Sequence, residues 1–215
     1  WGLDLGYERR LGTRGVAGVN LFYRKVSDLI EVANTGVEGS EGEDTFLLTA
    51  RNAGDGSVWG VELDLSTPLT MFGMEHTGVF LNYSWLDSDI DDPFGSRRFN
   101  DQSKYVFNVG FIQDLPDWGA AFGATYRKQG DAFGRIVGEE VTTSYGADLE
   151  VFVEKRFGQN FVLRLTGSNL LDAKKEETFN KFNTLDDQLN RDFDEYEVES
   201  EKAGPVFQLV GRYAF

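Results

Sequence analysis

Apolar and small residues alternate with polar ones along the last eleven residues of the chain, which end on an aromatic residue. Every second position of this segment carries Phe207, Leu209, Gly211, Tyr213 and Phe215. Successive side chains of a β-strand point to opposite faces, so the pattern predicts a strand with one apolar and one polar face. A strand that ends on an aromatic residue without a polar tail is typical of a chain end at a membrane–water boundary.

The composition favours strands over helices as the way for this chain to cross a membrane. Hydrophobic residues make up 40% of the 215 residues, and no run approaches the ~18 consecutive apolar residues that a spanning helix needs. Only helices and closed barrels satisfy the backbone polar groups in lipid, so the alternative is a barrel. Cysteine is absent, which excludes disulfide bonds and thiolate metal sites.

The charge of the chain argues against nucleic acid as a partner. Asp and Glu total 36 and Lys and Arg total 21, which gives a formal net charge of -15. Binding to phosphate backbones needs a basic stripe, whereas acidic loops are better suited to divalent cations. We therefore expect no nucleic-acid partner.

Alternating segments of about ten or more residues, the length of a tilted transmembrane strand, recur along the chain. We predict about nine of them, near residues 1–11, 15–32, 46–67, 77–88, 103–114, 119–129, 141–157, 161–169 and 205–215. In the seventh segment, Leu149, Val151 and Val153 share one face. Asp148 and Glu150 lie on the other, so one face is predicted to meet lipid and the other a wet interior.

The connections between these segments alternate in length. We expect short turns at residues 12–14, 68–75, 115–118 and 158–160, and long loops at about 33–45, 87–103, 129–141 and 170–204. Outer-membrane barrels have short periplasmic turns and long extracellular loops. The pattern therefore predicts long extracellular loops and a periplasmic C-terminus.

Nine strands do not make a complete bacterial barrel, because such barrels have an even number of strands and an open sheet would leave unpaired edges in lipid. The chain also begins at Trp1 inside an alternating segment. We expect the chain to be a piece of a longer polypeptide whose N-terminal part contains further strands.

Short motifs along the chain resemble the C-terminal barrel of TonB-dependent outer-membrane receptors. They are WGLDLGYE at residues 1–8, VNLFY at 19–23, SDLI at 27–30, NAG at 52–54, GVEL at 60–63, NYSWLDS at 82–88, SNLLD at 168–172 and GRYAF at 211–215. Each motif is weak alone, but their order and spacing cover essentially the whole chain. The resemblance implies an all-β, antiparallel transmembrane β-barrel of 22 strands around an N-terminal plug, with residues 1–215 forming about nine of its C-terminal strands.

The resemblance also implies a function and a set of partners. It implies an active transporter in the outer membrane of a Gram-negative bacterium, which binds and imports a scarce nutrient with energy transduced by TonB. The nutrient would be a ferric siderophore, another metal chelate or a saccharide. The implied partners are outer-membrane lipid and lipopolysaccharide, the missing N-terminal part, TonB through that part, the barrel-assembly machinery and the small-molecule nutrient.

Two groups of residues are candidates for specific roles. Arg127, Phe133 and Arg135 lie in or next to a predicted long loop and could hold an anionic ferric chelate. Tyr213 and Phe215 form, as the resemblance implies, the signal that the assembly machinery reads. Phe215 would lie in the periplasmic interfacial girdle.

A weak metal-site candidate is the acidic run with Asp87, Asp89 and Asp91. Its acids alternate as in a calcium loop, but Asp92 replaces the turn glycine and Arg98 occupies the position of the bidentate Glu. We therefore predict a solvated acidic loop that attracts divalent ions loosely, and neither a dedicated metal site nor a cofactor.

Catalytic interpretations have little support. The single histidine, His76, has no acid–base partner at a recognisable spacing. The carboxylate pairs Glu62/Asp64 and Asp148/Glu150 each share a strand face, as a hydrolase dyad could, but a polar interior wall explains them more simply. We predict that the protein is not an enzyme.

Two alternatives to a transporter remain open at this stage. One is a smaller structural or enzymatic outer-membrane barrel, against which the odd strand count argues. The other is a soluble all-β binding domain such as a sandwich, which would leave the terminal aromatic and the long alternating strands unexplained.

Overall fold

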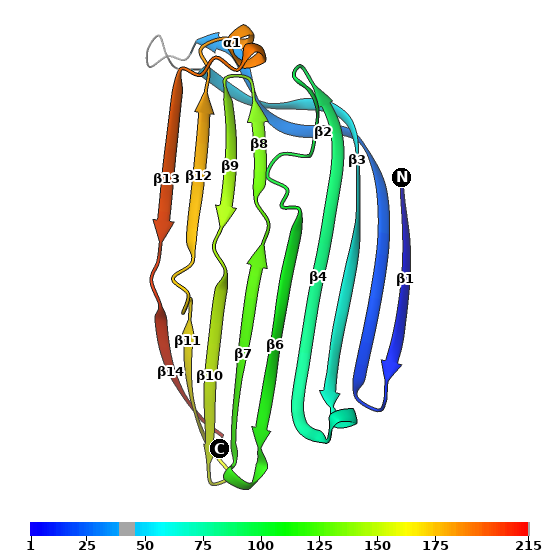
Figure 1. The fold of residues 1–215 in the computed structure, drawn as a ribbon, viewed down its shortest axis with the longest axis vertical. Coiled ribbons are helices and arrows are strands. Elements are labelled where there is room, and N and C mark those ends of the chain that lie inside the picture. Colours follow the sequence, from blue (N-terminus) through cyan, green and yellow to red (C-terminus); the bar gives the residue numbers. More distant parts are fainter. Residues whose placement is uncertain (39–45, 215) are drawn as a thin grey trace.

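The computed structural model of the chain describes residues 1–38 and 46–214, and these form an all-β structure. The main sheet has ten strands, nine of them in the order β1-β2-β3-β4-β6-β7-β10-β11-β14 and the tenth, β5, paired with β4. The strands on this path are β1 (Gly2–Leu11), β2 (Gly15–Glu38), β3 (Phe46–Leu69), β4 (Met74–Asp92), β6 (Tyr105–Leu115), β7 (Ala120–Gln129), β10 (Asp148–Phe157), β11 (Phe161–Ser168) and β14 (Val206–Tyr213). All their pairings are antiparallel (Figure 1). Each of the nine expected segments thus contains one strand of this path, although the bounds of several differ from those expected.

A second, four-stranded sheet continues part of the first. It consists of β8 (Ala132–Ile136), β9 (Glu139–Tyr145), β12 (Lys174–Lys181) and β13 (Glu195–Lys202), in the order β13-β12-β9-β8. In Figure 1 they lie above β14, β11, β10 and β7, respectively, so that the second sheet extends these four strands upward. The helix α1 (Leu185–Asn190) lies between β12 and β13 at the top.

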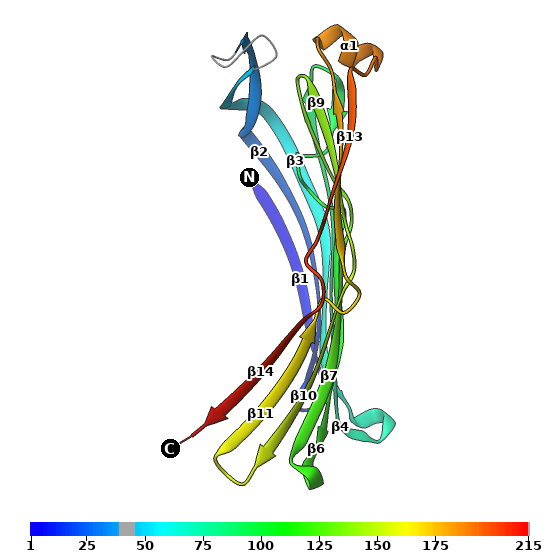
Figure 2. The ribbon, with the colours of Figure 1, turned by 90° about the vertical axis from the view of Figure 1, so that its left-hand side faces the viewer.

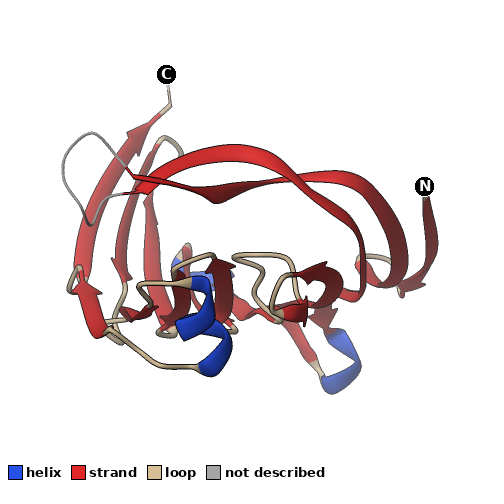
Figure 3. Ribbon diagram, turned by 90° about the horizontal axis from the view of Figure 1, so that it is seen from above, coloured by secondary structure: helices blue, strands red, loops and turns tan. Residues whose placement is uncertain are grey.

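The sheet is curved and open. Among the described residues, β1 pairs only with β2 and β14 pairs only with β11, so β1 and β14 are the two edge strands of the main sheet. Figure 2 shows the curvature from the side, and Figure 3 shows from above that β2 and β3 arch across the concave side. Antiparallel sheets twist, and this twist accumulates over many strands into a curved surface.

The expected short turns are confirmed, and they lie together at the lower end of the sheet (Figure 1). Two of them contain a single turn of 3-10 helix, η1 (Thr70–Phe72) and η2 (Pro116–Trp118). Each is closed by a glycine in the left-handed conformation, Gly73 at φ 73° and Gly119 at φ 55°. Glycine takes this conformation without a steric penalty, which explains its place at the turn ends.

The predicted long loops are only partly loops, and this part of the sequence interpretation is wrong. Residues 129–141 contain β8 and the start of β9, and residues 170–204 contain β12, α1 and β13. The acidic run at residues 87–92 continues β4, and β5 (Gly95–Arg97) folds back on it. Part of the expected loop at residues 33–45 lies outside the described residues, and its first part continues β2.

The predicted seventh segment, 141–157, is also two strands, β9 and β10. The interruption lies at Gly146, whose backbone N–H donates to the carbonyl of Lys174 at 2.6 Å. A Cβ at this position would lie 2.6 Å from the backbone nitrogen of Lys174, so the close approach requires glycine. Within the part of the chain that the structure describes, no helix is long and apolar enough to span a membrane.

Candidate functional site

One face of the main sheet is apolar across its full width. A row of register partners runs from Leu5 in β1 through Leu21 and Val61 to Trp85 in β4. On β10, Val151 and Val153 of this face are 39% and 50% exposed, whereas Phe152 and Glu154 of the opposite face are half-buried. Side chains diverge on a convex surface and converge on a concave one, so the apolar face is the convex face of the curved sheet.

This exposed apolar surface is far larger than a soluble domain tolerates. Of the described apolar residues, only Ile90, Ala132 and Phe182 are buried, and many large ones are exposed, with Leu5 and Leu209 both at 65%. Monomeric soluble proteins rarely expose contiguous apolar patches larger than a few hundred Å². The convex face therefore requires an apolar environment around it.

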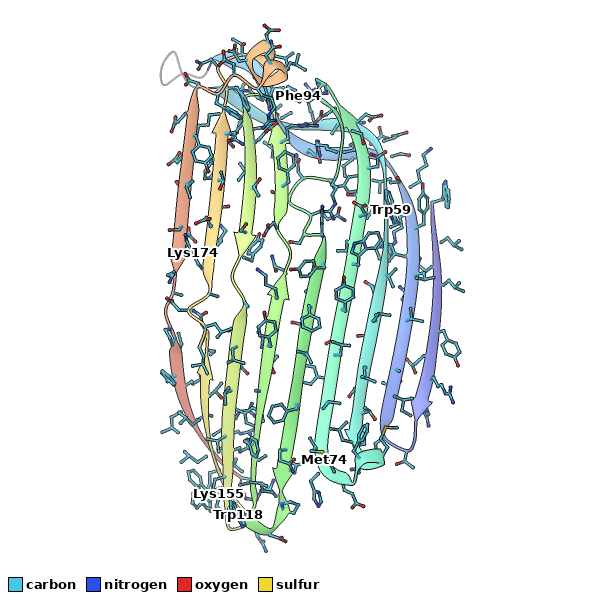
Figure 4. All side chains as sticks on the ribbon, in the orientation of Figure 1. Trp59, Met74, Phe94, Trp118, Lys155 and Lys174 are labelled. Atoms are coloured by element: carbon cyan, nitrogen blue, oxygen red, sulfur yellow. The ribbon has the colours of Figure 1, made fainter. Side chains whose placement is uncertain are left out.

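Aromatic side chains gather at two levels of this apolar face. The upper group consists of contacting rings, Trp1–Tyr23, Tyr23–Trp59, Tyr83–Tyr105, Tyr83–Phe107 and Phe107–Tyr126, with centroids 5.5–6.5 Å apart. The lower group contains Phe111–Phe122 and Phe157–Phe161, at 6.0 and 5.9 Å. Figure 4 places Trp59 in the upper half of the sheet and Trp118 at its lower end. We call these groups the upper and lower aromatic belts.

A lysine lies next to each aromatic belt. The ammonium group of Lys155 donates to the carbonyl of Trp118 at the lower turn (Figure 4). The ammonium group of Lys128, whose register partner Phe107 belongs to the upper belt, donates to the carbonyl of Tyr145. Both cations thus reach backbone oxygens at the ends of the apolar face, as long cationic side chains do at a membrane interface.

The concave face of the main sheet is polar, and its charges are paired between strands. The amide of Asn20 donates to Glu62 at 3.0 Å, and that of Asn82 donates to Asp64 at 2.6 Å. On the same face, nearer the β14 edge of the sheet, Glu154 accepts from Arg212 at 3.1 Å and lies 3.8 Å from Arg164. The carboxylates Glu62 and Asp64 therefore each have a polar partner on a neighbouring strand, in agreement with a polar wall.

Three phenylalanine rings lie against glycines of the concave face. Phe80 is the register partner of Gly110, and a Cβ at Gly110 would lie 2.5 Å from the Phe80 ring. Phe22 lies over Gly60 and Phe152 over Gly123 in the same way. Glycine is required at these positions because the ring occupies the space of a side chain.

Above the upper belt, the upper parts of β2 and β4 and the strands β5 and β8 enclose a space that we call the hollow. It contains buried charged side chains. Arg97 of β5 donates to Glu31 of β2 at 2.6 Å and to Asp92 of β4 at 2.7 Å. Arg135 of β8 donates to the two carboxylate oxygens of Asp92 at 2.9 and 3.0 Å. We call Glu31, Asp92, Arg97 and Arg135 the ion cluster. Their side chains are only 6–13% exposed.

The ion cluster is electrically balanced and fully hydrogen-bonded. It contains two guanidinium and two carboxylate groups, and no buried side-chain nitrogen or oxygen of the described residues is without a partner. Burial acts to lower the pKa of Arg97, but the hydrogen bonds and charges of Glu31 and Asp92 outweigh it and raise this pKa above its ordinary value. Arg97 therefore keeps its charge, and the hydrogen bonds of the cluster tie together three hairpins that are distant in the sequence.

Two cavities adjoin the ion cluster. One, of about 490 Å³, lies between β2 and the β8–β9 hairpin, with Ile30, Asn100 and Val141 among its lining residues. The other, of about 260 Å³, is lined in part by Phe94 and Arg51. Glu31, Val32, Arg135 and Ile136 line both cavities. These four residues form the partition between the two compartments of the hollow.

The structure separates the residues that the sequence suggested for ligand binding. Arg127 lies on the concave face of the main sheet, half-exposed and within 3.9 Å of Asp148 and 3.7 Å of Glu150. Arg135 lies in the ion cluster, with its guanidinium 5.1 Å from the ring centroid of Phe94. Phe133 lies on β8, where its carbonyl accepts from the backbone of Asp101. Arg135 and Arg127 thus belong to different sheets and have different partners.

The acidic run does not form the expected solvated loop. It is strand, and successive residues on one face of a strand are about 6.5–7 Å apart, too far for Asp87, Asp89 and Asp91 to surround one cation. Asp87 accepts from Arg98 at 2.8 Å, and Asp89 accepts from Ser96. No group of three or more His, Cys, Asp or Glu residues suited to a metal occurs within residues 1–38 and 46–214.

Two further residues of interest lie at the lower end. Tyr213 is 61% exposed and pairs in register with Phe161 of the lower belt. Phe215 lies outside the described residues. His76 lines a cavity of about 270 Å³ beside the short turns, together with Arg14, Glu75 and Asp114.

The sequence interpretation missed Glu31, Asp92 and Arg97. Glu31 is 66 residues from Arg97 in the sequence, and Asp92 is 43 residues from Arg135. No local spacing connects these positions, because they meet only through the folding of separate hairpins. The sequence offered one indication of the cluster, the adjacent arginines Arg97 and Arg98 close to an acidic segment. Buried arginines require carboxylate partners.

Comparison with known protein families identifies a match over most of the chain. A family described as TonB dependent receptor-like, beta-barrel, matches residues 1–170. The match covers the main sheet from β1 through β11 (Figure 1). No curated protein sequence matches the chain.

Proposed function

Because the chain belongs to the TonB-dependent receptor-like β-barrel family, whose members act in TonB-dependent transport across the outer membrane, we propose that it forms C-terminal strands of the barrel of a nutrient importer. Residues 1–215 are assigned to this barrel, and the plug and the earlier strands are assigned to another part of the same receptor. The contact with TonB is made through that other part. The protein acts as a transporter and not as an enzyme.

One observation carries the assignment of the membrane-facing surface. The convex face is apolar from β1 to β14 and lies between two aromatic belts, while the concave face bears paired charges. Outer-membrane barrels have this arrangement, with an apolar outer band, aromatic girdles at both interfaces and a polar interior. The convex face contacts lipid, and the concave face lines the lumen.

The two free edges support a larger, closed barrel. Unpaired N–H and C=O groups are costly in lipid, so β1 and β14 pair with further strands of the receptor. A barrel of 22 strands accommodates the nine neighbouring strands of the main sheet together with thirteen others, by the family resemblance described above.

The position of the turns sets the proposed orientation. Short turns of outer-membrane barrels are periplasmic and long connections are extracellular. The turns at η1 and η2 and the C-terminus are therefore placed in the periplasm. The second sheet, α1 and the ion cluster project outside the cell, where the lipopolysaccharide leaflet surrounds their base.

The nutrient is proposed to be a small molecule such as a ferric siderophore, another metal chelate or a saccharide. Arg127, at the upper end of the lumenal wall, offers a half-exposed guanidinium to an anionic chelate. Arg135 and Phe133 belong to β8, which lies above β7 in Figure 1. The extracellular hollow and the lumen below it are the proposed route.

Uptake in cells tests this function. A strain that depends on the complete receptor is supplied with radiolabelled ferric siderophores and with labelled oligosaccharides, with and without a protonophore. The proposal predicts energy-dependent uptake of at least one compound, and reduced uptake in an Arg127→Ala variant that reaches the outer membrane in normal amount.

Fractionation tests the membrane assignment separately. The receptor should partition with outer membranes and migrate differently on gels before and after heating. Recovery of the receptor in the soluble fraction would support the alternative of a soluble all-β binding domain. Heat-modifiable migration without energy-dependent uptake of any compound would support the alternative of a structural barrel.

A further inference from the structure

The upper parts of β2 and β3 form an arm that leaves the plane of the main sheet. The arm comprises residues 29–35 and 47–53, which remain paired with each other in register, for example Ile30 with Asn52 and Val32 with Ala50. Figures 2 and 3 show this arm crossing the concave side of the sheet. The arm therefore lies across the proposed entry to the lumen.

The arm begins at an irregularity of the β2–β3 ladder. The register shifts between Val26 and Leu29 and again between Leu29 and Ile30. In the same place, Asp28 has φ 55° and Gly54 has φ 117°. A β-bulge bends its strand and interrupts the ladder hydrogen bonds. The bulge gives the arm a point at which it can bend without losing the pairing on either side.

Side chains at the bulge replace the lost ladder bonds. The backbone N–H of Asp28 donates to the carboxylate of Asp55 at 3.1 Å, and that of Gly54 donates to the side chain of Asn52 at 2.8 Å. Across the two strands, the amide of Asn52 also donates to the carboxylate of Asp28, and all three bonds are exposed and lie at or next to the bulge. They can therefore be retained while the arm changes its angle to the sheet.

Beyond the bulge, the arm is attached to β5 and to the β8–β9 connection mainly by polar and charged contacts. Glu31 accepts two hydrogen bonds from Arg97, at 2.6 and 3.3 Å, and Asn34 donates to the carbonyl of Val137 at 3.1 Å. Arg97 and Arg135 are in turn connected through Asp92. The cavities of about 490 and 260 Å³ adjoin these contacts. Ile30 and Val32 of the arm are 71% and 55% exposed, so their burial contributes little to holding the arm in place.

We propose that the arm is a lid, hinged at the bulge around Asp28 and Gly54 and closed by the bidentate pair of Glu31 with Arg97. In the closed position the lid covers the hollow beside Ile136. When Glu31 leaves Arg97, the two paired strands of the arm swing together and open the hollow to the outside. The lid deepens the proposed function, since it controls access to the nutrient's route, and it rests on that function only for the identity of what enters.

The absence of cysteine from the sequence allows a direct accessibility test. A single Ile136→Cys substitution in the full chain, in outer membranes, places a thiol in the partition of the hollow, and a membrane-impermeant maleimide measures its exposure. Adding Glu31→Gln should increase its labelling rate about tenfold or more, the factor that corresponds to the loss of a charge-assisted hydrogen bond. Arg97→Lys, which keeps the charge but loses the fork geometry, should give a smaller increase.

Two controls separate lid opening from general loosening, and a crosslink tests the hinge motion itself. Asp4→Asn breaks an exposed ion pair with Arg24, at 3.2 Å, on the sheet side of the bulge and should not change the labelling of Ile136→Cys. Asp186→Cys, at an exposed position of α1, should be labelled equally fast with and without the Glu31→Gln substitution. Disulfide formation between Asn34→Cys and Val137→Cys should slow the labelling of Ile136→Cys in the Glu31→Gln background.

Several results would overturn the proposal. They are an unchanged labelling rate at Ile136→Cys in Glu31→Gln, an equal increase at Asp186→Cys, or no effect of the disulfide. All three measurements are made without a nutrient. They therefore stand or fall independently of the uptake experiment that tests the proposed function.

Discussion

Replacing Val151 by arginine tests which face of the sheet meets lipid. Val151 lies on the convex face, and its register partners are Ala124 on β7 and Gly167 on β11. On β7, Ala124 lies midway between Tyr126 of the upper belt and Phe122 of the lower belt. Val151 is therefore near the middle of the apolar band.

The expected cost follows from this depth. An arginine on the lipid face costs about 2–4 kcal/mol at the bilayer midplane and about 0–1 kcal/mol near the interfaces. Val151→Arg should thus cost about 2–4 kcal/mol. Leu149→Arg should cost less, because its partner Tyr126 belongs to the upper belt. Glu150→Arg places the charge in the polar interior and should cost the least of the three.

The assay is reversible unfolding of the complete receptor in lipid vesicles, measured by denaturant titration for each variant. A Val151→Thr variant controls for the loss of the apolar side chain without the introduction of a charge. The order Val151 above Leu149 above Glu150 is the prediction. If Glu150→Arg destabilised the receptor as much as Val151→Arg, the assignment of the two faces would be wrong.

Three further predictions concern packing, pH and assembly. Gly110→Ala should destabilise the receptor by about 1–3 kcal/mol through its clash with the Phe80 ring, whereas Gly78→Ala, with open space around it, should not; equal unfolding midpoints would contradict this. A hydrogen bond from Lys175 lowers the pKa of Glu177 below its ordinary 4.5, so the stabilisation is present above pH 4.5 and is lost as the pH falls through the lowered pKa; NMR titration of Glu177 should show a higher pKa in Lys175→Met than in the unchanged receptor, and an unchanged pKa would contradict this. Phe215→Ala should reduce the amount of receptor inserted, measured by surface labelling, while the nutrient affinity of the inserted fraction stays unchanged; normal abundance with reduced affinity would assign the C-terminal strand to the binding site.

Nine strands of the main sheet were predictable because each has one apolar and one polar face. On β10, the alternation of Val151 and Val153 with Glu150 and Glu154 is visible in the sequence. The short turns were equally visible from Gly12, Pro116 and Gly158, since these residue types favour tight turns.

Most of the second sheet was not predicted, because β12 has mainly polar residues on both of its faces. Only residues 141–145 of β9 fall within a predicted segment. On β12 and β13, the pairing is supported by ions such as Lys181 with Glu195 and Glu197, at 3.2 and 2.8 Å. Such strands lie outside the apolar band and need no apolar face, so their sequence resembles that of a loop. These segments are strands because they pair with one another in the folded protein, and the local sequence alone does not show this pairing.

The ion cluster could not be predicted for a related reason. Arg135 was recognised as a candidate for anion binding, but its partner Asp92 was assigned to a solvated acidic loop. The two residues are brought together by the folding of the β4–β5 hairpin beside β8. Sequence alone indicates that such charges need partners without indicating which partners they have.

The most direct test of the membrane-facing sheet is a fluorescence scan along β10. Single cysteines at positions 149 to 154 of the complete receptor carry a small fluorophore, and the vesicles contain lipids brominated near the middle of their acyl chains. Strong quenching is expected at 151 and 153, intermediate quenching at 149 and weak quenching at 150, 152 and 154. Equal quenching at odd and even positions, or strong quenching at 150, 152 and 154 instead, would contradict the account of a lipid-facing convex surface and a polar concave one.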